Sequence, residues 1–225
     1  MTPSDEIIAS LGELVRSGKV LYIGISDTPA WEVARMQTTA ELRGWPPFAA
    51  LQVEYSLIER TTERELLPMA ASLGLGVIPW APLGGGVLTG KYSAADLATA
   101  GSDSPVGTRR DHAKANGTLT TRGLAVADAV VGVARELGAS ASQVALAWTL
   151  RHPSVVSSLI GARTPEQLQE NISALDVTLD DSHLDALHAA SVIDLGFPHE
   201  FLMRPMVRGV TTGRTSVRPR PIRTW

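Results

Sequence analysis

The sequence contains no cysteine and only three lysines, and aromatic residues make up 5% of its 225 residues. Without cysteine there is no disulfide framework, no thiolate metal site and no cysteine nucleophile. The net charge of −3 does not indicate a nucleic-acid partner. No apolar run reaches the roughly 18 residues of a membrane span, and the first residues lack the apolar core of a signal peptide. We therefore expect a cytoplasmic protein without a metal site, a membrane or a nucleic-acid partner.

The composition is that of an ordinary globular protein. Apolar residues make up 44% of the chain and charged residues 19%, which argues against disorder. A chain of 225 residues is long enough to bury a substantial core and is most simply one domain.

The stretch from Gly74 to Lys91 carries the strongest local signal. Residues 77–81 form a short apolar run typical of a buried strand, and a glycine-rich loop that ends in lysine follows it. Glycines let backbone N–H groups approach an anion, and the ammonium of Lys91 adds positive charge. Trp80 offers a flat apolar face beside this loop. A planar ring with a phosphate tail, in other words a nucleotide cofactor, suits both features.

Other interpretations of such loops stay open. Gly85 to Lys91 has the spacing of a P-loop, but Tyr92 follows where a magnesium-binding Ser or Thr belongs. The same stretch also fits a flexible loop after a core strand, with Trp80 as an ordinary core residue. Residues 24–28 approach the nucleophile elbow of hydrolases but lack its last glycine.

Four apolar segments alternate with helical patterns along the chain. The expected strands cover residues 20–25, 48–55, 77–81 and 155–161, and each is nearly continuously apolar. Such strands are typical of a parallel sheet that is covered on both faces. We therefore predict an α/β fold of about four parallel strands with flanking helices.

Polar or glycine-rich positions stand at the carboxyl end of every expected strand. They are Ser26 and Asp27, the segment from Gln52 to Tyr55, the segment from Trp80 to Lys91, and residues 161–163. Gln52 is expected to be the lone polar interior residue of its strand, satisfied either by a ligand amide or by neighbouring backbone. Ligands bind at this edge of parallel sheets, so the pattern alone favours a binding site there.

Two segments lack clear periodicity. Residues 93–122 form a long polar stretch, which is usually functional or mobile. Residues 204–225 form an arginine-rich tail, which fits either a polyanion partner or a solvated terminus. We therefore divide the chain into a domain at residues 1–203 and a tail at residues 204–225.

Four motifs together resemble the aldo-keto reductase family. They are GKVLYIGIS, LQVEYSLIER, PWAPLGGGVLTGKY and LIGARTPEQLQEN, in the order and at the spacing of the carboxyl-terminal half of that family. The resemblance implies strands five to eight of a (β/α)₈ TIM barrel, here a partial barrel. It also implies an oxidoreductase lineage with NADP(H)-dependent carbonyl reduction.

The resemblance implies a cofactor-binding role for four groups of residues. Ser26, Asp27 and Gln52 meet the nicotinamide carboxamide, and Trp80 stacks on its ring. The pyrophosphate is surrounded by Ala81, Pro82, Leu83, Gly84, Gly86, Gly90 and Lys91, joined by Arg109. The adenosine end is held by Gly161, Ala162, Arg163, Gln167, Glu170 and Asn171. Two positions depart from the family: Asp27 replaces an asparagine, and Gln167 stands where some members have an arginine for the 2′-phosphate.

The catalytic Asp, Tyr, Lys and His of the family lie on its first four strands, and no position of this chain corresponds to them. We therefore expect no catalytic residues here and no activity from this chain alone. A non-catalytic nucleotide-binding or subunit protein is the alternative. Because a half-barrel exposes two sheet edges, the expected partners are a second copy or the missing amino-terminal half, besides the nicotinamide cofactor.

Overall fold

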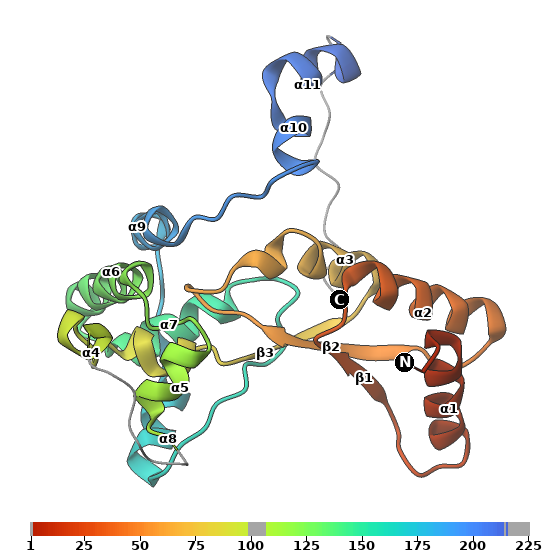
Figure 1. Ribbon diagram of the computed structural model, residues 1–225, viewed down its shortest axis with the longest axis horizontal. Coiled ribbons are helices and arrows are strands. Elements are labelled where there is room, and N and C mark those ends of the chain that lie inside the picture. Colours follow the sequence, from red (N-terminus) through yellow and green to blue (C-terminus); the bar gives the residue numbers. More distant parts are fainter. Residues whose placement is uncertain (1, 99–106, 214, 216–225) are drawn as a thin grey trace.

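A parallel three-stranded sheet lies at the centre of the computed structural model, which describes residues 2–98, 107–213 and 215 (Figure 1). The strands are β1 (Ile23–Ser26), β2 (Phe48–Glu54) and β3 (Gly76–Trp80), in that spatial order. Helix α1 (Ser4–Arg16) precedes β1. Helix α2 (Ala30–Arg43) lies between β1 and β2 in the chain, and helix α3 (Leu66–Leu73) lies between β2 and β3. The predicted α/β fold with a parallel sheet is confirmed.

The segment after β3 is mainly helical. Side-chain caps start several of its helices: Thr120 accepts a hydrogen bond from the Gly123 N–H, and Ser140 forms a reciprocal capping box with Gln143. The further elements are η1 (Thr61–Glu63), η2 (Gly84–Thr89), α4 (Ala94–Ala98), α5 (Arg109–Ala115), α6 (Thr121–Leu137), α7 (Ala141–Leu150), α8 (Pro165–Ile172), η3 (Ser173–Asp176), α9 (Asp181–Ser191), α10 (His199–Met203) and α11 (Pro205–Thr212).

The expected fourth strand forms only in part. Residues 154–159 run beside β3, where Val155 makes an isolated parallel bridge with Val77. The Val156 N–H donates to the Val77 carbonyl at 3.0 Å, and the Leu159 N–H donates to the Pro79 carbonyl at 2.8 Å. Three residues of this segment therefore span two residues of β3. The extra residue interrupts the ladder as a bulge does, so the regular sheet has three strands instead of four.

The sheet is covered on one face only, which corrects the expectation of two covered faces. Leu51, Val53 and Val77 are at most 1% exposed, and they pack with helical side chains in one apolar core. The alternate residues lie on the other side, called here the open face, and are half-buried or exposed. The helices around the sheet pack on its other side, and the side chain of Val156 lies over Gly76 on the open face. Its residues are Gly24, Ser26, Ala50, Gln52, Glu54, Gly76, Ile78 and Trp80.

A buried polar cluster ties α9 to the segment after β2. The guanidinium of Arg60 is 7% exposed and donates to both carboxylate oxygens of Glu63, at 2.8 and 3.0 Å. Its Nη1 also donates to the Ser191 hydroxyl at 2.8 Å. Its Cζ atom lies 5.3 Å from the centre of the Trp148 ring. Because the buried charge is fully paired, the cluster fixes α9 without leaving an unsatisfied cation in the core.

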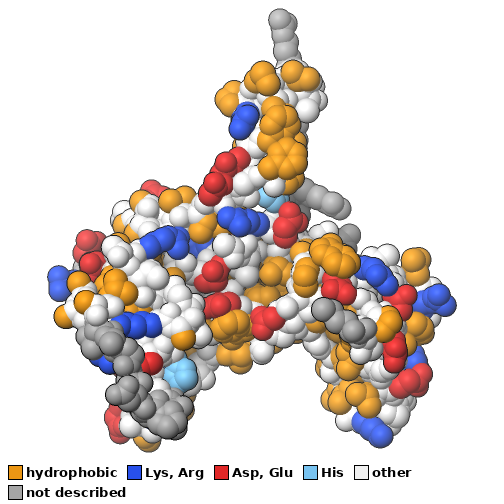
Figure 2. All heavy atoms as spheres, viewed as in Figure 1, with side chains coloured by type: hydrophobic (Ala, Val, Ile, Leu, Met, Phe, Trp, Pro, Cys, Tyr) orange, Lys and Arg blue, Asp and Glu red, His pale blue; other side chains and the backbone are white. Residues whose placement is uncertain are grey.

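Helices α10 and α11 stand away from the sheet and its helices (Figure 1). Apolar side chains gather on this projection (Figure 2), and Met206 and Val210 are 72% and 82% exposed. The structure thus describes part of the predicted 204–225 tail as helix α11, and the division at residue 203 stays a prediction. Arg218, Arg220 and Arg223 of that tail lie outside the described residues, as does Arg214. None of the described helices is both long enough and apolar enough to cross a membrane.

We expect the purified chain to self-associate because, among the described residues, no strand pairs with the outer edge of β1, and apolar side chains beside the sheet are exposed. Tyr22 beside β1 is 81% exposed, and Val156 beside β3 is 65% exposed. Light scattering should show dimers or larger species, and Tyr22→Lys combined with Val156→Lys should shift the distribution toward monomer. A sharp monomer peak with cooperative melting would contradict this expectation.

Candidate functional site

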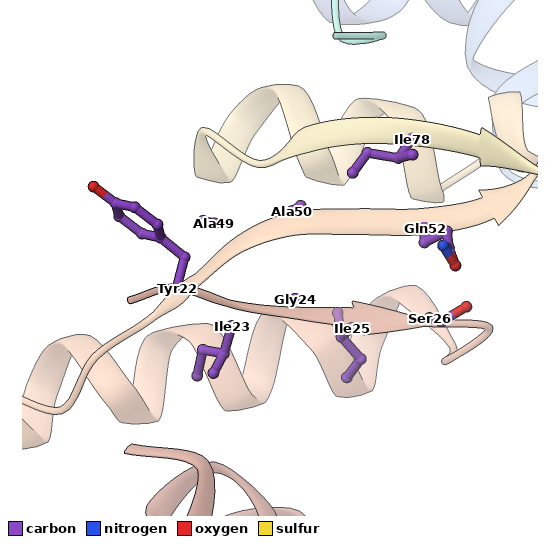
Figure 3. Close-up of a pocket in the computed structure, with 9 residues that line it drawn as sticks. All are labelled: Tyr22, Ile23, Gly24, Ile25, Ser26, Ala49, Ala50, Gln52 and Ile78. Atoms are coloured by element: carbon purple, nitrogen blue, oxygen red, sulfur yellow. The ribbon is translucent and has the colours of Figure 1, made fainter. Parts of the chain in front are cut away.

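The carboxyl ends of the three strands bring four predicted residues together. Ser26 pairs with Gln52 in the parallel register, and Figure 3 shows their side chains next to one another. The Asp27 N–H donates to the Gln52 carbonyl at 3.3 Å. The indole N–H of Trp80 donates to Asp27 Oδ1 at 3.0 Å, across the intervening strand. The four side chains thus form one polar group around an aromatic ring.

A shallow depression of about 410 Å³ extends from this group along the open face. Ser26 and Gln52 close it at the carboxyl end, and the opposite end lies at Tyr22 (Figure 3). Its lining is mainly apolar and combines glycine and alanine with isoleucine side chains, so it fits a flat or elongated group. The lining residues are Tyr22, Ile23, Gly24, Ile25, Ser26, Ala49, Ala50, Gln52 and Ile78.

Among the described residues, two other than glycine adopt left-handed backbone conformations, and both stand at strand ends in this region. Asp27 has φ 47° and Ala81 has φ 49°. Asp tolerates this region through local hydrogen bonds, whereas for Ala it costs roughly 1–2 kcal/mol. The surrounding contacts sustain this strain, since the Ala81 carbonyl accepts from the Gly84 N–H at 2.8 Å. Such strain typically marks functional turns.

The glycine-rich loop forms the short helix η2, in which Gly84, Gly85 and Gly86 all have positive φ. Pro82 is buried and Leu83 packs against the core, so their side chains anchor the loop. A Cβ at Gly86 would lie 2.9 Å from Lys91 Nζ, so the glycine leaves room for the ammonium above the backbone. Gly90 at the end of the loop has φ 73° and approaches the side chain of Val131.

Partial burial and two arginines lower the pKa of Lys91 at this loop. The pKa of Lys91 lies below its usual range because of partial desolvation and because of the positive charges of Arg109 and Arg163. Arg109 is the first residue of α5, whose N-terminus is closed by a capping box of Thr108 and Asp111. Arg163 precedes the amino terminus of α8. A nearby anion would therefore stabilise the charged form of Lys91.

The start of α8 holds the last group of predicted residues. Thr164 caps the helix by accepting from the Gln167 N–H at 3.3 Å, and Pro165 occupies the first turn. Gln167 Oε1 accepts from the Arg163 N–H at 2.9 Å, so this side chain fixes the turn before the helix. Gly161 and Ala162 are exposed just before Arg163, and Glu170 and Asn171 follow in the second turn of α8.

The residues therefore suit a ligand with an aromatic ring at one end and phosphates at the other. The indole of Trp80 is fixed at the strand ends by its hydrogen bond to Asp27, and the ammonium of Lys91 lies over Gly86 in the loop beyond it. Among the described residues, no group of His, Asp or Glu side chains is arranged to hold a metal ion.

Sequence reasoning counted Glu54 among the polar residues at the strand ends but gave it no role of its own; it lies on the open face and pairs with Trp80 in the register of β2 and β3. Burial raises the pKa of Glu54, and the charges of Glu59 and Asp27 raise it further. The expectation that Gln52 is the lone polar interior residue of its strand is therefore wrong. The signal was present, because residues two apart on a strand share a face.

Tyr55 follows β2 but points away from the open face. It is 2% exposed, its ring lies 5.1 Å from that of Trp148, and its hydroxyl donates to Glu63 Oε1 at 2.9 Å. Burial raises the pKa of Tyr55, and the Glu63 carboxylate raises it further. A tyrosine in this state is a weaker acid than free tyrosine and holds the Arg60 cluster together.

Comparison with known proteins agrees with this arrangement. The model of the Aldo/keto reductase family matches residues 1–192. The uncharacterized oxidoreductase YrpG of Bacillus subtilis is 40% identical over 187 residues, which cover 83% of this chain and 54% of that protein. The norsolorinic acid reductase of Aspergillus flavus is 33% identical over 215 residues, which cover 96% of this chain and 52% of that protein.

A probable aryl-alcohol dehydrogenase of Saccharomyces cerevisiae is also similar, at 32% identity over 205 residues that cover 90% of this chain and 60% of the yeast protein. The chain thus spans about half the length of the curated relatives it matches. With the family model matching most of the chain and oxidoreductases among its relatives, this chain belongs to the aldo/keto reductase family.

Proposed function

We propose that this chain is the NADP(H)-binding part of an oxidoreductase that reduces carbonyl groups. The observation that carries the proposal is the group of three cations at the glycine-rich loop, close to the aromatic platform at the strand ends. When bound, the cofactor supplies the hydride. The chain binds the phosphates through Lys91 and the loop backbone and orients the nicotinamide ring against Trp80.

The remaining predicted residues have matching tasks in this proposal. Ser26, Asp27 and Gln52 hold the carboxamide edge of the ring, because their polar groups converge beside Trp80. Arg163 and the capped start of α8 hold the 2′-phosphate of the adenosine end, which separates NADP(H) from NAD(H). Phosphates suit this region because Arg109 and Arg163 lie close enough to Lys91 to lower its pKa.

We further propose that the chain corresponds to strands five to eight of the family barrel. Three regular parallel strands and the bridged segment at residues 154–159 support this, together with the half-length match to the relatives. The partner that closes the sheet is then an amino-terminal half or a second copy. Either one covers the open face and pairs both uncovered edges.

A non-catalytic nucleotide-binding or subunit protein is the second candidate, and the state of Tyr55 favours it. Proton donation to a carbonyl oxygen needs a tyrosine of lowered pKa that reaches the substrate. Tyr55 is buried, its pKa is raised, and its hydroxyl donates a hydrogen bond to Glu63. Tyr55 is therefore unsuited to replace the family's proton donor.

The cofactor assignment predicts different effects for two cations. Arg163→Ala should weaken NADPH binding by ~1–3 kcal/mol and leave NADH nearly unchanged, because a charge-assisted hydrogen bond to the 2′-phosphate is lost. Lys91→Met should weaken both cofactors, since both carry the pyrophosphate. Fluorescence titration measures the affinity of each variant for NADPH and for NADH, with Arg208→Ala on α11 as a control. Equal losses of NADPH and NADH binding in Arg163→Ala would refute the assignment.

This chain by itself should not catalyse carbonyl reduction. General acid catalysis contributes about 10²–10⁴-fold, and Tyr55 is not placed to provide it. NADPH consumption with an activated aldehyde should stay at the background rate in both the natural chain and Tyr55→Phe. Turnover that Tyr55→Phe abolishes would overturn this prediction, whereas activity restored by adding an amino-terminal half from a related reductase would support it.

A further inference from the structure

Asp27 is held in one geometry at the end of β1. Its N–H donates to the Gln52 carbonyl at 3.3 Å, and its Oδ1 accepts from the Trp80 indole at 3.0 Å. The turn that carries it is closed by a hydrogen bond from the Thr28 hydroxyl to the Ser26 carbonyl at 2.9 Å. The left-handed backbone of Asp27 directs its carboxylate toward the tryptophan. Asp27 is therefore a positioning residue that fixes the indole plane of Trp80.

A second carboxylate flanks the same ring. Glu54 is the register partner of Trp80 on the neighbouring strand and lies half-buried on the open face. The Asp27 charge acts on Glu54, as does that of Glu59. Negative charge thus gathers around the aromatic platform, whereas positive charge gathers at Lys91, Arg109 and Arg163. The site is polarised from its ring end to its phosphate end.

We propose that Asp27 and Glu54 make this site select the oxidised form of the nicotinamide cofactor. The inference rests on the proposed function, and in particular on Trp80 as the platform for the nicotinamide ring. The oxidised ring carries a positive charge and the reduced ring is neutral, while the phosphates of the two forms are the same. The two carboxylates therefore stabilise the oxidised form alone, and the three cations stabilise both forms equally.

Asp27→Asn separates the charge from the positioning role, because asparagine keeps an oxygen that accepts from the Trp80 indole. We expect it to weaken binding of NADP⁺ about four- to tenfold, the Coulomb effect of one charge at several ångströms near a water-exposed surface. Binding of NADPH should change less than twofold. Glu54→Gln should act in the same direction, and Glu41→Gln on α2 serves as the control with no effect on either form.

Asp27→Ala removes both the charge and the hydrogen bond. It should weaken binding of both NADP⁺ and NADPH. Compared with Asp27→Ala, Asp27→Asn should restore binding of NADPH only. The affinities are measured by tryptophan fluorescence titration of the whole chain, with a thermal melt for each variant to confirm that it is folded.

Each result of these titrations either supports or overturns the inference. A selective loss of NADP⁺ binding in folded Asp27→Asn supports the inference. Equal changes for NADP⁺ and NADPH, or no change for either, overturn the charge selection and leave the proposed function intact. If the natural chain binds neither form, the proposed function fails and this inference fails with it.

Discussion

The parallel register of β1, β2 and β3 places the carboxyl end of every strand along one edge of the sheet. Ser26, Gln52 and Trp80 are distant in sequence, and the register alone makes them neighbours. The chain then continues from β3 into the glycine-rich loop, so Trp80 and the loop that ends at Lys91 lie next to one another at this edge. The site therefore depends on backbone pairing more than on any single side-chain contact.

The sequence was sufficient to predict β2, β3 and the common edge of the strands, whereas β1, expected at residues 20–25, begins only at Ile23. Residues 48–55 and 77–81 read as strands because their apolar runs end at glycine or polar residues, and the structure agrees within about one residue. The capped start of α8 was visible from Thr164, Pro165 and Gln167. Local chemistry determines these features, so a local pattern reveals them.

Features that depend on the packing of distant segments could not be read from the sequence. The nearly continuous apolar runs suggested that both faces of the sheet are covered. Composition does not reveal whether an element packs on a given face, and the helices that pack on the sheet lie opposite the open face. Glu54 points to the open face and Tyr55 points away from it, although they are adjacent. The fourth strand is interrupted by one extra residue opposite β3, which no pattern of residue types indicated.

The buried Arg60 cluster has a consequence for the order in which the molecule acquires its structure. Arg60 and Glu63 are only three residues apart, whereas Ser191 lies 131 residues from Arg60. Closing so long a loop costs conformational entropy that only the packed helices between them offset. During synthesis, the core around Tyr55 and Trp148 stays incomplete until α9 has been made. The hydrogen bond from Arg60 to Ser191 thus completes the fold late and locks the first third of the chain to the last.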